Sequence, residues 1–226
     1  MVRETPLKAP DHSPRVQRKR LERKELIVDT AMRLLGEGGL EWVTVGRLAK
    51  ELDYTPGALY RYFPSMDVLL AHMQKRAIAS LHKRISEAIA PLAGAGKEID
   101  RLRATAECYL SATEGEASHE LSLIGQMLAS PKVLIGDPIA TETAPKLIAL
   151  LMLVEQQISH AQEAGVLSPG IARERAVQLW AALQGAIALG KLARFDAGLF
   201  SAQHVGHGLL ENLLVAWGAP QDAANK

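Results

Sequence analysis

The sequence predicts an all-α protein, and three observations lead to that prediction. Apolar residues recur at helical spacing through most of the 226 residues, proline and glycine divide these runs, and the sequence shows no useful strand-like alternation and no repeat. Hydrophobic residues make up 48% of the chain and charged residues 23%, which is typical of a globular protein with a buried core.

The chain is expected to begin with a disordered arm over residues 1–15, because its first residues include three prolines and few apolar side chains. A helical pattern starts at Val16. Its apolar residues share one face at a spacing of 3.6 residues, and a group of glycines ends the run. The apolar residues are Ile27, Ala31, Leu34 and Leu35, and the glycines are Gly36, Gly38 and Gly39.

Two short helices are predicted next. Thr44 is a suitable N-cap for the first helix, and Thr55 is one for the second, which has Pro56 at its first helical position. Asp53 lies in the turn between them, where aspartate tolerates the left-handed conformation. Pro64 is expected to end the second helix.

A long helix is predicted from Met66 to about Ala90, with Ser65 as its N-cap. The break PLAGAG follows this helix, and the remaining helical patterns are separated by proline or glycine. Their expected ranges are 97–113, 116–130, 141–165, 171–194 and 201–217.

The two short helices form a helix-turn-helix pattern, whose second helix enters the DNA major groove in proteins that use it. The guanidinium of Arg61 is suited to donate two hydrogen bonds to guanine, and Gly57 lets the backbone approach the bases. Tyr60, Tyr62 and the hydroxyl of Thr44 are candidates for phosphate contacts. The alternative is a helical hairpin whose tyrosines only pack.

From Leu21 to about His82 the chain resembles the DNA-binding domain of the TetR family of one-component transcriptional regulators. The resemblance is carried by ELIVDTAMRLLGEGG, VTVGRLAKELDYTPGALYRYFPS and DVLLAHM, with LYRYF and the following serine cap as a specific family mark. It implies a DNA-binding domain over residues 16–82 and a helical effector-binding and dimerisation domain over residues 83–226. It also implies that seven residues lie at or near DNA: Thr44, Arg47, Thr55, Gly57, Tyr60, Arg61 and Tyr62.

Three residues depart from the family pattern. Asp53 stands where glycine is usual in the turn, Gly46 stands where some members carry a base-reading side chain, and Met66 replaces a frequent phosphate-contacting lysine. The last two differences leave the strength and the sequence of the operator open. Basic residues nearer the amino terminus could compensate by following the DNA backbone or entering a minor groove, or could form an ordinary solvated surface. These are Arg15, Arg18, Lys19, Arg20 and Arg23.

Charge is divided unevenly along the chain. Residues 1–90 hold 16 Lys and Arg and 11 Asp and Glu, whereas residues 91–226 hold 10 and 14, for a total of +1. A basic amino-terminal part indicates a polyanionic partner, although scatter in surface charge would give the same numbers.

Two carboxyl-terminal segments are predicted to form the homodimer interface that the family resemblance implies. Small side chains share one face of the first segment, and an apolar stripe runs along the second. They are Ala181, Gly185 and Ala188, and Val205, Leu209, Leu213 and Ala216. Alternatively, both stripes serve the core of a single chain.

A small-molecule effector, apolar or amphipathic, is expected to bind among mostly hydrophobic side chains with a few polar anchors. The candidates are Tyr109, His119, Met127, Met152, Gln156, Trp180 and Gln184. For each of them alone, core packing or surface exposure is the simpler explanation.

No catalytic, metal or cofactor site is expected. Cys108 has no visible activating partner, His204 and His207 lack further ligands at recognised spacing, and nucleotide-binding and hydrolase motifs are missing from the sequence. The sequence shows no signal peptide, no apolar run long enough for a membrane span and no second cysteine, which together indicate a cytoplasmic protein with no membrane partner.

The expected function is that of a ligand-responsive repressor, which binds a palindromic operator in double-stranded DNA as a dimer and is released by its effector. Two alternatives stay open. One is an activator or a co-repressor-dependent regulator of the same family, and the other is a helical ligand-binding protein with a vestigial DNA-binding head.

Overall fold

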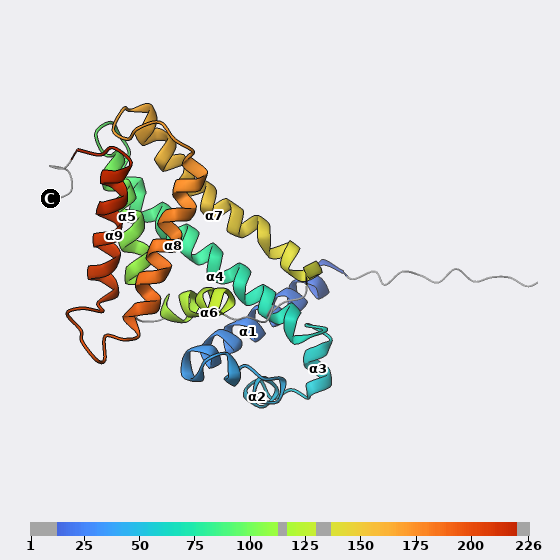
Figure 1. The fold of residues 1–226 in the computed structure, drawn as a ribbon. Helices are drawn as coiled ribbons and strands as arrows, with labels where there is room; N and C mark the ends of the chain where they lie inside the picture. The colour runs from blue at the N-terminus through green and yellow to red at the C-terminus, as the bar shows by residue number, and fades with distance from the viewer. Residues whose placement is uncertain (1–12, 113–116, 130–136, 221–226) are drawn as a thin grey trace, which may run out of the picture. The chain divides into compact units, whose positions relative to one another are not determined.

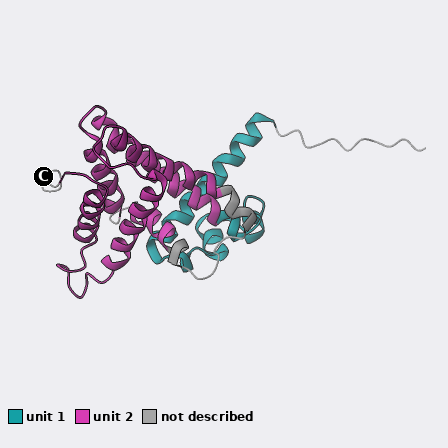
Figure 2. Ribbon diagram, turned by 45° about the horizontal axis from the view of Figure 1, so that its top comes forward, with its two compact units in different colours: residues 1–69 teal, residues 70–226 magenta. Residues whose placement is uncertain are grey.

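A computed structural model describes residues 13–112, 117–129 and 137–220, and every regular element within these ranges is a helix (Figure 1). The predicted all-α fold is confirmed. The chain divides into two compact units, residues 1–69 and residues 70–226 (Figure 2). None of the helices in the described ranges is long and apolar enough to cross a membrane.

The first unit is a cluster of helices around a small apolar core. It contains α1 (Pro14–Gly38), the 3₁₀ turn η1 (Leu40–Trp42), α2 (Val45–Glu51), α3 (Pro56–Tyr60) and the start of α4 (Met66–Ile89). Ile27 from α1, Leu48 from α2 and Leu59 from α3 are each at most 5% exposed. Helix α1 starts two residues before the predicted Val16, and residues 1–12 of the predicted arm lie outside the described residues.

The predicted caps are confirmed. The side-chain oxygens of Thr44, Thr55 and Ser65 each accept a hydrogen bond from the backbone N–H three residues later, at 3.2 or 3.3 Å. Asp53 has a φ of 54°, the left-handed conformation expected of it between α2 and α3. These contacts fix the start of each helix and the turn that directs α3 away from α2.

Helix α3 is shorter than predicted, because it ends at Tyr60 rather than at Pro64. The backbone N–H groups of Tyr62 and Phe63 both donate to the carbonyl of Leu59, so the chain tightens into a turn directly after the helix. That turn places the Phe63 ring in the core, where it is 4% exposed. Burial of this ring therefore sets the end of α3.

The predicted end of α1 among the glycines is confirmed, since the helix continues through Gly36 and ends at Gly38. Gly39 follows with a φ of 76°, which glycine adopts without strain. Its N–H donates to the carbonyl of Leu35 at 2.8 Å and so satisfies one of the last carbonyls of the helix.

The second unit holds the rest of α4 and five further helices. They are α5 (Glu98–Ser111), α6 (Ala117–Ala129), α7 (Asp137–Glu163), α8 (Ala172–Gly190) and α9 (Ala202–Ala216), with the 3₁₀ turn η2 (Ala90–Leu92) after α4. Helix α8 packs against α7 and α9, and α5 packs against α7, α8 and α9. All five helices predicted for this region are present, and α7 starts four residues earlier than the predicted position 141.

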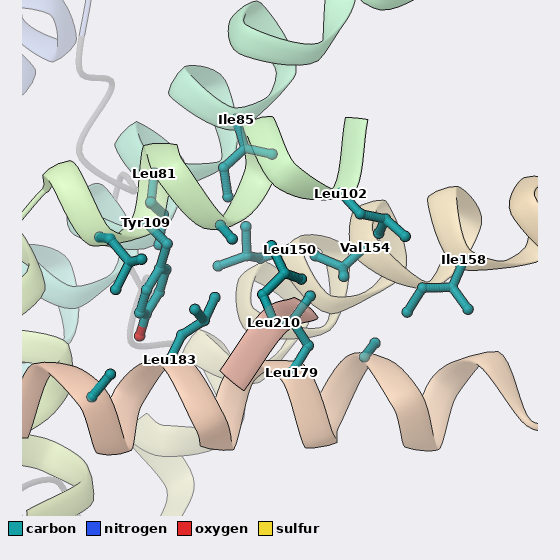
Figure 3. Packing of buried hydrophobic residues seen from close by; sticks show 14 of the residues in the cluster. Leu81, Ile85, Leu102, Tyr109, Leu150, Val154, Ile158, Leu179, Leu183 and Leu210 are labelled. Atoms are coloured by element: carbon teal, nitrogen blue, oxygen red, sulfur yellow. The ribbon is translucent and has the colours of Figure 1, made fainter. Parts of the chain in front are cut away.

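Figure 3 shows part of the apolar core of the second unit, to which α4, α5, α6, α7, α8 and α9 contribute side chains. Helices α5 and α9 approach closely because Gly206 has no side chain: a Cβ there would lie 2.6 Å from Leu110 Cδ2. Arg103 on α5 also donates two hydrogen bonds to Glu211 on α9, at 2.7 and 2.9 Å. This close packing fixes α5 against α9.

Candidate functional site

The exposed surface of α3 gathers polar groups that suit a nucleic acid. Thr55, Gly57, Tyr60 and Arg61 are all exposed, whereas Leu59 on the opposite side of the helix is buried. Because the Thr55 oxygen already accepts the capping hydrogen bond from the backbone, its own O–H stays available to donate to a phosphate oxygen. The helix thus presents donors outward while its apolar side is held by the core.

Two stacked tyrosines lie beside α3. The rings of Tyr54 and Tyr62 are 6.4 Å apart between centroids and 18° from parallel. Arg23 of α1 donates a hydrogen bond to the Tyr54 hydroxyl, and its guanidinium lies 5.7 Å from the centroid of the same ring. Tyr62 is half-buried by this arrangement, with its ring held against Tyr54.

The first turn of α2 carries a second exposed cation. The guanidinium of Arg47 stacks over the Trp42 ring at 4.1 Å from the centroid, beside the capping residue Thr44. Trp42 itself lies against Gly38, where a Cβ would come within 2.0 Å of the indole. This tryptophan was not predicted as part of the site, and the glycines four and three residues before it were the only signal in the sequence.

All seven residues that the family resemblance implies at DNA lie in the first unit, on or directly beside α2 and α3, which pack against each other. Six of them are exposed and Tyr62 is half-buried. The seven are Thr44, Arg47, Thr55, Gly57, Tyr60, Arg61 and Tyr62. Their contact with DNA stays a prediction.

Gly57 gives a direct test of close backbone approach. A Cβ at Gly57 would meet nothing within 4 Å, so Gly57→Ala is expected to keep or raise the free energy of unfolding, by up to about 1 kcal/mol from helix propensity. The same methyl group is expected to lower DNA affinity, because it stands between the α3 backbone and the bases. Thermal unfolding and DNA binding of the variant separate the two effects. A DNA affinity of Gly57→Ala equal to that of the wild type would contradict the close approach at Gly57.

In the second unit, three of the predicted effector residues form one hydrogen-bonded chain. Trp180 Nε1 donates to the Tyr109 hydroxyl at 3.0 Å, and this hydroxyl donates to Gln184 Oε1 at 2.6 Å. Figure 3 shows Tyr109 reaching from α5 toward α8, near Leu183. The amide nitrogen of Gln184 lies next to Gly125 of α6, where a Cβ would come within 3.0 Å of it.

Tyr109 and Trp180 also line an apolar cavity of about 40 Å³ between α4, α5, α7 and α8. The other lining residues are Ile85, Thr105, Leu147, Leu150, Leu151, Val154, Ala176, Leu179 and Leu183. No charged side chain belongs to this lining, so the cavity suits a neutral apolar group with the hydrogen-bonded chain at its edge.

The structure does not bring Met152, Gln156 or His119 into this cavity. Met152 and Gln156 line a separate hollow on the outer side of α7, beside Glu155 and Arg173. His119 on α6 is half-buried. The side chain of Met127 lies outside the described residues.

Burial raises the pKa of the Tyr109 phenol to about 12, and the hydrogen bond from Trp180 opposes part of that rise. Because the folded state keeps the phenol protonated to higher pH than the unfolded state, its contribution to stability is complete below pH 10. It falls as the pH rises from about 10 to 12, by roughly 2–3 kcal/mol in total. Tyr109→Phe is expected to remove this part of the pH dependence, measured as the free energy of unfolding at pH 8 to 12. Equal slopes for the two proteins would contradict the buried, neutral phenol.

Comparison with known proteins places the first unit among bacterial regulators. Residues 27–73 match the family model described as "Bacterial regulatory proteins, tetR family". The nucleoid occlusion factor SlmA of Mannheimia succiniciproducens is 39% identical over 69 residues, which are 30% of this chain and 32% of that protein. The chain therefore covers about a third of that curated relative.

Solved structures match nearly the whole chain in fold. RolR in complex with resorcinol aligns with a TM-score of 0.64 and 15% identity, over 92% of this chain and 93% of that one. SmeT, the repressor of the Stenotrophomonas maltophilia multidrug efflux pump SmeDEF, aligns with a TM-score of 0.61 and 19% identity, over 86% and 89%. At these identities the two matches establish the fold alone.

Proposed function

Since the chain is a TetR-family DNA-binding transcriptional regulator, we propose that it is a cytoplasmic, ligand-responsive repressor that binds a palindromic operator as a homodimer. The observation that carries this proposal is the surface of α3. Its exposed residues offer an arginine, hydroxyl donors and a glycine, while the buried Leu59 and Phe63 fix the helix against α1 and α2.

Each group on this surface has a definite role in DNA recognition. Arg61 donates two hydrogen bonds to a guanine edge, and the backbone at Gly57 comes close to the bases. The hydroxyls of Thr44, Thr55 and Tyr60 donate to phosphate oxygens, which positions α3 without reading sequence. Arg47, held over Trp42, adds a cation at the phosphate backbone.

The effector is a neutral, apolar or amphipathic small molecule that binds at the cavity beside Tyr109 and Trp180, which widens from about 40 Å³ to admit it. An apolar lining with a single hydrogen-bonded chain at its edge favours a ligand that has one polar group. Once the Gln184 side chain turns away, the Tyr109 hydroxyl supplies both a donor and an acceptor to such a group. The solved relative RolR, which was crystallised with resorcinol, has the same fold.

The homodimer forms through the outer faces of α8 and α9. The buried residues of α8, including Leu179 and Leu183, lie on the opposite side from Val177, Ala181 and Gly185, which are exposed. An exposed helix face of small and apolar residues allows a second copy to approach closely, and two DNA-binding heads are required for two half-sites. The exposed positions on α9 include Leu209 and Val215.

Effector binding releases the DNA by shifting the population between two states of the dimer. The boundary between the two units falls within α4, so a change in the packing of α4 around the effector cavity changes the position of the DNA-binding heads. Effector and DNA then oppose each other's binding by the same factor. A regulator that activates, or that needs its ligand for DNA binding, would show the opposite sign of this coupling.

Binding of the purified protein to the DNA immediately upstream of its own gene tests the proposal. With excess random DNA as competitor, tight binding to the upstream DNA is expected to persist. Small neutral aromatic compounds can then be screened for those that release the protein from this DNA. Binding equal to that of random DNA at every upstream region tested would contradict the repressor function and favour a ligand-binding protein with a vestigial head.

A further inference from the structure

No residue in the amino-terminal half of α1 is buried. The buried residues of the helix begin at Ile27, so the thirteen residues Pro14–Leu26, here named the basic overhang, span about 20 Å of helix ahead of the first buried residue. Six of them are Lys or Arg and two are Glu, and all are exposed except the half-buried Lys24. The basic overhang is therefore an exposed, positively charged surface that is suited to bind a polyanion.

The basic overhang is fixed to the same surface that carries α3. Arg20 Nη2 donates to the carbonyl of Arg61 at 3.2 Å, at the end of α3. Arg23 contacts Tyr54 in the turn before α3, and Lys24 lies 5.4 Å from the centroid of the Phe63 ring. The overhang therefore begins at the proposed DNA surface and leads away from it.

Its cations form a row along one helix face. Arg15, Lys19 and Arg23 are four residues apart, which places them one above another on the helix. Arg23 joins the row to the tyrosine stack, whereas neither Arg15 nor Lys19 makes a hydrogen bond or ion pair with the described part of the chain. Arg18, on another face, is occupied by Glu22 at 3.5 Å.

We propose that the basic overhang is a second DNA contact, which lies along the sugar–phosphate backbone beside the base pairs that α3 contacts. This inference rests on the proposed function, because it takes α3 as the DNA-reading helix. The six residues Pro14–Lys19 lie beyond the contact of Arg20 with Arg61 and span about 9 Å of helix. Phosphates on one DNA strand follow each other by about 3.4 Å along the helix axis, so this part of the overhang reaches about three flanking base pairs. Contacts of this kind add affinity on any sequence and compensate for the missing lysine at Met66.

DNA is favoured over an anionic membrane by where the overhang is attached. Its polar contacts to Arg61 and Tyr54 place its row of cations beside donors that already suit phosphates. Its exposed apolar residues are scattered singly, with Val16 and Leu21 on different faces, and do not form the apolar face that a membrane-surface helix needs.

The test compares the wild type with Arg15→Gln/Lys19→Gln on two random-sequence duplexes and on the upstream operator. One duplex is long enough to cover about three flanking base pairs, and the other ends where the α3 footprint ends. On the long DNA, loss of two phosphate contacts is expected to lower the slope of log affinity against log salt by about 1.8. From 50 to 200 mM salt the wild type would then lose about twelve-fold more affinity than the variant. The control Lys146→Gln/Lys191→Gln removes two exposed cations of the second unit.

The outcomes separate the inference from the function on which it rests. A smaller slope on the long duplex, with little change on the short one and with specific operator binding retained, supports the proposal. Equal slopes for wild type and variant, with specific operator binding intact, overturn the overhang contact alone. Equal slopes combined with loss of binding to phosphatidylserine vesicles in the variant would assign the overhang to membranes. Wild-type protein that never prefers its operator would overturn the proposed function itself.

Discussion

Arg61→Ala is expected to lower operator affinity by about 1–3 kcal/mol, which corresponds to roughly 5- to 150-fold, and to relax the preference at one base pair of each half-site. The Arg61 side chain is exposed, and the fixed part of the residue is its backbone carbonyl, which accepts from Arg20. Removing the guanidinium is therefore expected to take away the proposed DNA contact without taking away a contact of the fold. Equilibrium binding to the operator and to single-base-pair variants of it measures both effects.

The control for Arg61→Ala is Arg173→Ala. Arg173 is an exposed arginine of the second unit that pairs with Glu155 at 3.2 Å, and its loss is expected to leave DNA binding unchanged. An equal loss of affinity on operator and random DNA for Arg61→Ala would contradict base readout and reduce Arg61 to a phosphate contact.

Gly185→Glu is expected to convert the proposed dimer into a monomer. A Cβ at Gly185 meets nothing within 4 Å and the position is exposed in the protomer, so the substitution is expected to leave the fold intact while it buries a carboxylate in the proposed interface. An uncompensated buried charge costs about 3–5 kcal/mol, and a dimer would carry two of them. Operator affinity is expected to fall at least 100-fold, because one head then reads one half-site.

Sedimentation and operator binding at the same protein concentrations measure this effect. Ala79→Glu, which places the same charge on an exposed alanine of α4, is expected to leave both the mass and the affinity unchanged. A Gly185→Glu protein that stays dimeric would remove the outer face of α8 from the interface.

The sequence predicted those parts of the first unit that depend on local physics. Thr44, Thr55 and Ser65 were identified as caps because a hydroxyl before a helix satisfies a backbone N–H within three residues. The predicted end of α3 was wrong, because the true end depends on the burial of Phe63 against helices that precede it in the chain. No local sequence rule reports that packing. The stacking of Arg47 on Trp42 was missed for a similar reason, since it requires the open space at Gly38.

The effector cavity depends on contacts over longer distances in the chain. Tyr109 and Trp180 are 71 residues apart in the sequence, and Tyr109 and Gln184 are 75 apart. Each residue could therefore be proposed as an effector residue by itself, but the hydrogen bonds between them could not be predicted. Met152 and Tyr109 were predicted as effector residues for the same reason, the mostly apolar character of a ligand site. The position of Met152 on the outer side of α7 depends on how α7 is rotated against α8. The rotation of each helix about its own axis is set by the whole core, which periodicity alone does not fix.

Footprinting on the upstream DNA is the direct test of a proposed dimer that reads a palindrome through two copies of α3. We expect two symmetric protected segments, with their centres about one helical turn or a multiple of it apart, and loss of both in Arg61→Ala and in Gly185→Glu. A single protected segment that persists in Gly185→Glu, or protection spread evenly along the DNA, would contradict it.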